Sequence, residues 1–437
     1  MPTWIAPLLT RRMLICVFTG FSSGLPLYLL LNLLPAWLKT EGISLKAIGL
    51  LAIIQLPYTW KFLWSPLLDR FALPGFGRRR GWMLLTQIGL LLAVGVLGMQ
   101  SVSGLVPPTD WNSTLAFMTH PVTLLAVVVA LFSATLDIAL DAFRREILAE
   151  DELGLGNSVH VNAYRIAGLI PGSLSLILAD HLPWTQVFWI TAAFMLPGAA
   201  MTLLVSEPAI GKGSPRTLRD AVVLPFREFV GRQGWQSALL ILAFIFLYKL
   251  GDSLCTALAT PFYLDLGYSK SDIGLIAKNA GLWPAVIGGL LGGLWMVRLG
   301  INRALWLFGV VQVVSILGFA WLASLGQQAV IGADQRLALA LVIGFEALGV
   351  GLGTAAFVAF IARSTHPAYT ATQFALFTSL AAVPRTLINA SAGWLVEQMG
   401  WTQFFLLCCL LAMPGMALLC RVARWNETPR ALTHPSG

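Results

Sequence analysis

The sequence predicts an all-α integral membrane protein with twelve transmembrane helices in two six-helix halves that are pseudo-repeats of each other. Of its 437 residues, 57% are hydrophobic and only 11% are charged, whereas a soluble domain carries about 25% charged residues. Apolar runs separated by short polar loops recur along the chain, and most match the roughly 20 residues that cross a bilayer. Charged residues inside these runs recur at matching places in the two halves. This composition excludes both an ordinary soluble protein and a disordered chain.

The apolar runs form six spans on each side of one longer polar stretch. We expect the spans near residues 12–38, 45–68, 81–100, 122–142, 158–180, 185–205, 236–264, 272–297, 303–323, 336–362, 371–396 and 402–420. The first run has no small-residue cleavage site, so we interpret it as a retained span and not as a removable signal.

These spans divide the chain into four parts: an N-terminal half (1–205), a linker (206–235), a C-terminal half (236–424) and a short tail (425–437). The linker contains apolar residues that suit one face of a helix lying on the membrane surface. They are Leu218, Val222, Val223, Phe226 and Phe229.

The basic residues predict the orientation of the chain in the membrane. With the N-terminus in the cytoplasm, 19 of the 28 Lys and Arg residues lie on the cytoplasmic side, 4 lie on the opposite side and 5 lie inside spans. This asymmetry follows the positive-inside rule and predicts that both termini are cytoplasmic. It also accounts for the net charge of +8 without nucleic acid as a partner.

Nine ionisable residues lie inside the predicted spans, where each costs roughly 2.5–3.5 kcal/mol on insertion scales and marks a pathway or a pairing. The basic ones are Lys61, Arg165, Lys249, Lys278 and Arg385, and the acidic ones are Asp137, Asp141, Asp252 and Glu346. Lys61 and Lys278, Asp141 and Glu346, and Arg165 and Arg385 occupy corresponding spans of the two halves. Such a repeat is expected when two halves enclose a central site.

Two of these acids are four residues apart on one helix face. Asp137 and Asp141 compete for charge in a medium of low dielectric, so one of them is suited to taking up a proton. Asp141 lies closer to the cytoplasmic end and to Arg144 and Arg145, which favours a gate or loop salt bridge for it as the alternative to proton coupling. Asp252 has a comparable alternative, because Lys249 is three residues away and the two can form a structural ion pair.

The loop after the second span, SPLLDRFALPGFGRRRGW, resembles the signature loop of the major facilitator superfamily. The residues that carry this resemblance are Asp69, Arg70, Gly77, Arg78, Arg79 and Arg80. Asp69 is expected to hold a facing helix end or an arginine in one state and to release it in another, as a latch. The alternative is a basic loop that only fixes the topology.

At finer grain the chain resembles the AmpG-type muropeptide permeases along almost its full length. The matching stretches include GFSSGLPLYL (20–29), KFLWSPLLDRF (61–71), LDIALDAFRREIL (136–148) and ATQFALFTSLAAVPR (371–385). The resemblance implies a proton-driven importer, in the bacterial inner membrane, of N-acetylglucosaminyl-1,6-anhydro-N-acetylmuramic acid and its peptides. It also implies a role in peptidoglycan recycling and, in some hosts, in the induction of β-lactamase.

The resemblance assigns roles to the charged residues within the spans. Asp137 is the foremost candidate for proton coupling, followed by Asp141, Asp252 and Glu346. The substrate would meet the basic residues Lys61, Arg165, Lys249, Lys278 and Arg385, whose charge-assisted hydrogen bonds suit peptide carboxylates. Tyr28, Tyr164 and Tyr248 are candidates for stacking on sugar rings, with packing as the alternative for each.

Three other functions remain as alternatives. One is another proton-coupled transporter of the same superfamily, of the drug-efflux or acetyl-coenzyme A type. The second is a membrane enzyme, which the scattered histidines do not favour, because they form no metal-binding or nucleophile–base pattern. The third is a receptor, which would need no buried charges repeated in two halves. We therefore expect no cofactor, no metal and no obligate protein partner, but a small glycopeptide, protons and membrane lipids.

Overall fold

A computed structural model describes most of the chain. The described residues are 10–43, 48, 51, 54, 56–105, 110–207, 218–268, 272–273, 276, 278–327, 331–366, 369–383 and 391–426. Their regular structure is helical, and they group into two compact units. Unit 1 comprises residues 1–232 and 361–379, and unit 2 comprises residues 233–360 and 380–437.

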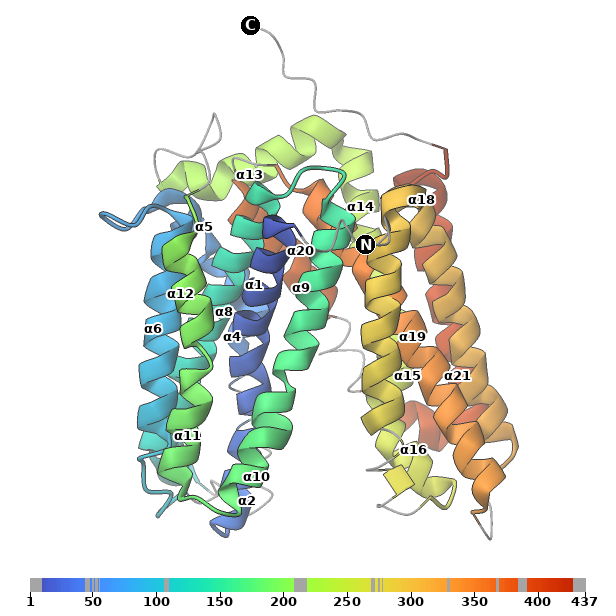
Figure 1. Ribbon diagram of the computed structural model, residues 1–437. Coiled ribbons are helices and arrows are strands. Elements are labelled where there is room, and N and C mark those ends of the chain that lie inside the picture. Colours follow the sequence, from blue (N-terminus) through green and yellow to red (C-terminus); the bar gives the residue numbers. More distant parts are fainter. Residues whose placement is uncertain are drawn as a thin grey trace, which may run out of the picture. The chain divides into compact units, whose positions relative to one another are not determined.

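Unit 1 is a bundle of long helices that pack side by side (Figure 1). The first span consists of α1 (Arg11–Tyr28), a π-helical turn η2 (Leu29–Leu33) and α2 (Leu34–Thr40). The other helices of this bundle are α6 (Arg79–Leu97), α7 (Trp111–Thr119), α8 (Pro121–Ile147), α9 (Leu153–Ala167), η5 (Ile170–Leu174), α10 (Ser175–Ala179), α11 (Trp184–Ala193) and α12 (Leu196–Leu204). Contacts of α1 with α9 and of α6 with α8 are the most extensive in this unit.

The second predicted span is not one continuous helix in its described part. It consists of α4 (Leu56–Trp60), the 3-10 turn η4 (Lys61–Leu63) and α5 (Ser65–Arg70). Pro57 and Pro66 lie in the first turns of the two short helices, where a missing backbone N–H costs least. The break places Lys61 at a turn between them.

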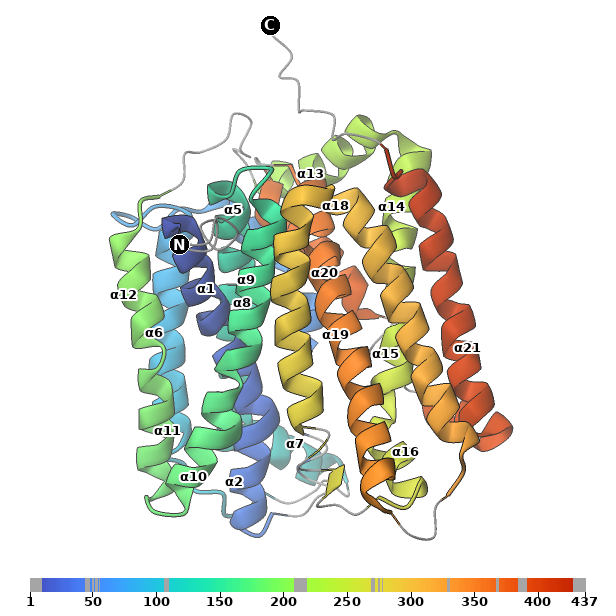
Figure 2. The ribbon, with the colours of Figure 1, turned by 45° about the vertical axis from the view of Figure 1, so that its right-hand side comes forward.

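Unit 2 contains the remaining long helices (Figure 2). These are α14 (Trp235–Leu247), α15 (Leu250–Ala257), α16 (Ala259–Asp265), α18 (Lys278–Ser324), most of α19 (Ala333–Ser364) and α21 (Ala392–Val422). Its apolar core includes a cluster of rings formed by Phe262, Phe319, Phe404 and Phe405. The helix α20 (Thr370–Val383) is shared, because its residues up to Ser379 group with unit 1.

Within the described residues, nine helical stretches are long and apolar enough to cross a membrane. Two of the nine contain a glycine with left-handed backbone, Gly300 (φ 73°) and Gly400 (φ 75°), and each of these stretches joins parts of two predicted spans. The second and eleventh predicted spans appear as the shorter helices α4, α5 and α20. Within the described residues, each of the twelve predicted spans therefore contains helical segments.

The predicted linker helix is α13 (Leu218–Gln233). It lies across the end of unit 1 at which α1 begins (Figure 1). Phe229 is buried and its ring lies 5.1 Å from that of Phe377 in α20, whereas Val223 and Phe226 are exposed. Of the described apolar residues of this helix, Phe229 thus packs on segment 361–379, whereas Val223 and Phe226 do not.

Candidate functional site

Two glycines of α1 allow α9 to approach closely. A Cβ atom at Gly20 would lie 2.1 Å from the carbonyl oxygen of His160, and one at Gly24 would lie 2.3 Å from that of Tyr164. Any side chain at these positions would force the helices apart. The contact also brings the ring of Tyr28 to 5.6 Å from the ring of Tyr164, so these two predicted aromatic residues form one pair. Arg165 follows Tyr164 in the chain.

Four side chains from α1, η4 and α8 form a buried group, which we call the Lys61 cluster: Ser23, Lys61, Asp137 and Asp141. Lys61 Nζ lies 3.8 Å from Asp137 Oδ2 and 3.9 Å from Asp141 Oδ2. Ser23 Oγ donates a hydrogen bond to Asp137 Oδ1. The lysine side chain is only 9% exposed, and the two aspartates are 13% and 15% exposed. One cation is therefore shared between two carboxylates inside a helical bundle.

This arrangement joins residues to which the sequence assigned separate roles. Lys61 was a candidate for the substrate, and Asp137 and Asp141 were candidates for the proton. Because the same ammonium group faces both carboxylates, a change in the charge of either aspartate changes the number of partners that Lys61 has.

Asp141 continues this network towards α9. Its Oδ1 atom accepts a hydrogen bond from Arg144 Nη2 at 2.8 Å, and Arg144 Nε donates to Asn157 Oδ1 at 2.8 Å. The salt bridge that the sequence offered as an alternative for Asp141 is present, together with the contact to Lys61. Between α1 and α9, Thr19 Oγ1 lies 3.1 Å from His160 Nδ1.

Sequence reasoning did not identify Ser23, Asn157 or His160 as part of a site. Ser and Asn have no charge to mark them within an apolar run, and a single histidine outside a ligand pattern gives no signal. The only hint was that Ser23 lies within the stretch GFSSGLPLYL, which carries the family resemblance.

Unit 2 contains a second set of predicted residues. Lys249 Nζ lies 2.9 Å from Asp252 Oδ2, which is the ion pair given as the alternative for these residues. Glu346 is buried in α19. The ring of Tyr248 stacks on Phe357 at 5.4 Å, and its hydroxyl donates to the carbonyl oxygen of Leu305. This tyrosine thus makes the contacts of a packing residue, which was its alternative role.

Two predicted basic residues of the second half are not characterised by the structure. Lys278 begins α18, but its side chain is not among those described. Arg385 lies outside the described residues. Their proposed contacts with substrate therefore stay predictions.

Residues at the connection between the second and third spans form another buried polar group with Glu146 of α8 and Thr372 of α20. We call this group the Asp69 cluster: Asp69, Arg78, Arg79, Glu146 and Thr372. Arg79 Nη2 lies 2.8 Å from Asp69 Oδ1 and 2.6 Å from Glu146 Oε1. Arg78 Nη2 lies 3.2 Å from the same oxygen of Glu146. The side chains of Asp69 and Arg79 are 0% and 1% exposed, so this is an ion-pair network shielded from solvent.

Asp69 also holds the beginning of α20. Its Oδ2 atom accepts hydrogen bonds from the backbone N–H of Thr372 at 2.9 Å and from the hydroxyl of Thr372 at 2.7 Å. Its Oδ1 atom accepts from the backbone N–H of Ala371 at 3.3 Å. A carboxylate at a helix N-terminus satisfies unpaired amides and is favoured by the helix dipole. Asp69 thus makes both contacts expected of it, with a facing helix end and with an arginine.

The other residues of this loop shape its turn. Gly77 has a φ of 85°, and Glu207 lies against it and accepts hydrogen bonds from the backbone N–H groups of Arg79 and Arg80 at 2.7 and 3.0 Å. The guanidinium of Arg80 donates to the carbonyl oxygens of Thr202 and Leu203 at the end of α12. Arg70 instead lies over the ring of Phe71, 5.5 Å from its centroid.

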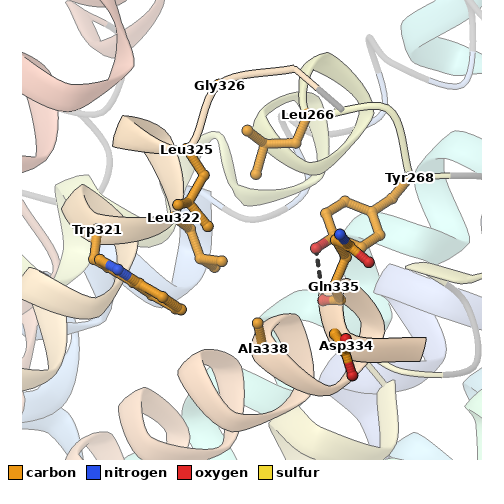
Figure 3. A pocket seen from close by; sticks show the side chains of 9 residues that line it. All are labelled: Leu266, Tyr268, Trp321, Leu322, Leu325, Gly326, Asp334, Gln335 and Ala338. Atoms are coloured by element: carbon orange, nitrogen blue, oxygen red, sulfur yellow. Dashed lines mark hydrogen bonds between the residues drawn. The ribbon is translucent and has the colours of Figure 1, made fainter. Parts of the chain in front are cut away.

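A cavity of about 210 Å³ lies in unit 2 (Figure 3). Leu266, Trp321, Leu322 and Leu325 line it, and the hydroxyl of Tyr268 donates to the carbonyl oxygen of Gln335 at 2.8 Å. None of the predicted site residues lines it. Among the residues that the structure describes, no group of three His, Cys, Asp or Glu side chains is arranged to hold a metal ion.

Known proteins resemble this chain along most of its length. The family model described as Major Facilitator Superfamily matches residues 16–388. A protein of Haemophilus influenzae described as uncharacterized is 50% identical over 416 residues, which cover 95% of each chain. The anhydromuropeptide permease of Escherichia coli K12 is 41% identical over 411 residues, which cover 93% of this chain and 79% of the permease.

Solved structures show the same fold. The crystal structure of the human organic anion transporter MFSD10 matches with a TM-score of 0.67 and 16% identity, over 96% of this chain and all of that one. At this identity the match concerns the fold alone, and it confirms the predicted architecture of two six-helix halves. The family match and the permease relative identify a membrane transporter and not an enzyme. The chain therefore belongs to the major facilitator superfamily and, within it, to the family of AmpG-type permeases.

Proposed function

We propose that this protein imports anhydromuropeptides, the turnover products of the bacterial cell wall, across the inner membrane, and that a proton gradient drives this uptake. The relationship to the Escherichia coli anhydromuropeptide permease supports the choice of substrate. The Lys61 cluster carries the proposal for coupling, because it places a cation between two carboxylates within a span.

The coupling step starts from Asp137 in its charged form. Protonation of Asp137 removes one of the two anionic partners of Lys61, which leaves the ammonium group able to bind a carboxylate of the peptide. Release of the proton restores the ion pair and expels the anion. Arg165 and the Tyr28–Tyr164 pair lie on the same helices, α1 and α9, and are the proposed contacts for the rest of the ligand.

The second element is the Asp69 cluster, which we propose to be the cytoplasmic latch. In the structure Asp69 holds the first turn of α20 through three hydrogen bonds. Release of this helix end would open the cytoplasmic side of an alternating-access cycle. The placement of both termini in the cytoplasm rests on the 19 basic residues that this orientation puts on that side.

Uptake into proteoliposomes tests the proposal. Labelled N-acetylglucosaminyl-anhydro-N-acetylmuramyl tripeptide is supplied with and without an inward proton gradient, to wild type, Asp137→Asn and Asp334→Asn. Asp334→Asn is the matched control, because it neutralises an exposed carboxylate outside the charged clusters. We expect gradient-driven accumulation by wild type and the control, and its loss in Asp137→Asn.

Two results would count against parts of this proposal. Absence of uptake by a folded wild type, under any gradient, would contradict the assignment of anhydromuropeptides as the substrate. Equal accumulation by Asp137→Asn would remove this residue from the coupling step and leave Asp141, Asp252 or Glu346 as candidates.

A further inference from the structure

Arg144 links the Lys61 cluster to α20, within the part of that helix that groups with unit 1. The residue is 2% exposed and lies on α8, three residues after Asp141. Its Nη2 atom donates to Asp141 at 2.8 Å, and its Nε atom donates to Asn157 at 2.8 Å. The amide of Asn157 is itself fixed, because its Nδ2 atom donates to the carbonyl oxygen of Leu153 at 2.7 Å.

The other side of the guanidinium faces α20. Its central carbon lies 5.8 Å from the ring centroid of Phe374, which is within the range of a cation–π contact. Phe374 is 2% exposed and belongs to the part of α20 that groups with unit 1. Arg144 therefore touches both a carboxylate of the charged cluster and a ring two residues after Thr372, which Asp69 holds.

One nitrogen of Arg144 is not satisfied in this arrangement. Among the described residues, Nη1 is buried and has no hydrogen-bond partner. A buried donor without a partner is unfavourable, because it has lost its hydrogen bonds to water and gained none in the protein. The cost is tolerable while Asp141 and Asn157 fix the other two nitrogens, and it favours movement of the guanidinium once either partner is lost.

We infer that Arg144 is a positioning residue that couples the charge of Asp141 to the closure of segment 361–379. When Asp141 is charged, it holds the guanidinium against Phe374 and the segment stays packed. When Asp141 is neutral, the guanidinium is free to turn, loses Phe374 and weakens the closed contact. The inference rests on the proposed function only in taking this segment as a closing element.

A double-mutant cycle tests this link without ligand or proton gradient. The reporter is Ala375→Cys, a buried position in α20, in a chain in which the exposed Cys420 is changed to Ser. The rate of labelling by a maleimide in detergent measures how often the segment opens. We expect Asp141→Asn to raise this rate about tenfold, which corresponds to about 1.4 kcal/mol.

The effect of Asp141→Asn on the labelling rate is then measured in chains that carry a second substitution. In Arg144→Gln the segment should label fast already, and Asp141→Asn should add less than twofold. Arg145→Gln is the matched control, because Arg145 donates to the carbonyl oxygen of Ala362 at 2.7 Å and pairs with Glu150. It contacts the same segment by another route, so the tenfold effect of Asp141→Asn should persist there.

A second pair of variants avoids changing the buried charge. Phe374→Leu removes the ring that faces Arg144 and should abolish the effect of Asp141→Asn. Phe377→Leu should keep it, because that ring packs on Phe229. A tenfold effect that persists in Arg144→Gln or Phe374→Leu, or no effect of Asp141→Asn in any background, overturns the inference. Because the labelling experiment uses no substrate, its result does not depend on whether the uptake experiment succeeds.

Discussion

The carboxylate of Asp69 accepts two hydrogen bonds from Thr372, one from its backbone N–H at 2.9 Å and one from its hydroxyl at 2.7 Å. The two residues are 303 positions apart in the chain, and Arg79 binds the same carboxylate at 2.8 Å. A loop of the first half therefore caps a helix that begins the eleventh span. This contact is one of several that join residues 361–379 to the N-terminal part of the chain.

The first prediction concerns the charge of Asp69. Asp69→Asn replaces an acceptor of four donors by an amide, and it leaves Arg79 with Glu146 as its remaining carboxylate. Loss of one partner from a buried ion pair should lower the free energy of unfolding by roughly 3 kcal/mol. Thermal unfolding in detergent measures the change.

Thr372→Val is the control for this variant, since it removes only the hydroxyl donor and should cost about 1.5 kcal/mol. If Asp69→Asn is no more destabilising than Thr372→Val, the ion pair with Arg79 contributes nothing to stability.

A second prediction compares two glycines in the same loop. Gly77 (φ 85°) and Gly75 (φ 80°) both have left-handed backbone, so alanine at either should cost about 1–2 kcal/mol in strain. A Cβ at Gly77 would also lie 2.7 Å from the carboxyl carbon of Glu207, whereas nothing lies within 4 Å of one at Gly75.

Gly77→Ala should therefore displace Glu207 from the two amides that it caps at the start of α6, at a further cost of about 1 kcal/mol. The unfolding midpoints of Gly77→Ala and Gly75→Ala are compared in the same detergent. Equal midpoints would show that Glu207 moves aside without loss.

The sequence was sufficient for the helical spans, because crossing a bilayer demands long apolar runs whatever the packing. It also indicated the partners of Asp69 by type, a helix end and an arginine. It did not identify Thr372 as that helix end, because nothing local marks which distant segment meets a loop. Glu207 was likewise missed, since its role depends on the left-handed turn at Gly77.

The charged residues within the spans show the same limit. Because a charged side chain within a membrane is energetically costly, the sequence alone identified Lys61, Asp137 and Asp141 as individual candidates. That they form a single cluster depends on the break in the second span, which places Lys61 at a turn facing α8. The hydrophobic pattern predicts one span there and does not reveal where its helix is broken.

A third prediction follows from this cluster. Lys61→Gln leaves Asp137 and Asp141 close together without their shared cation, and it should lower the free energy of unfolding by roughly 3 kcal/mol. Lys61→Gln combined with Asp137→Asn restores the balance of charge, with Asp141 still paired with Arg144. The double variant should therefore recover most of the stability but no gradient-driven uptake. Additive losses of stability in the double variant would contradict the pairing.

The last prediction concerns pH and His366, which lies in the turn between α19 and α20. Burial lowers the pKa of His366 below its ordinary 6.5, opposed by the carboxylate of Glu228 and supported by the charges of Arg232 and Arg145. The unfolded chain then binds more protons than the folded one in the pH range just below 6.5, so stability falls as pH decreases through that range. Unfolding midpoints at pH 5.5 and 7.5 measure this slope. His366→Gln should reduce it, whereas His181→Gln, at an exposed position, should leave it unchanged. An unaltered slope in His366→Gln would mean that another group sets the acid sensitivity of this turn.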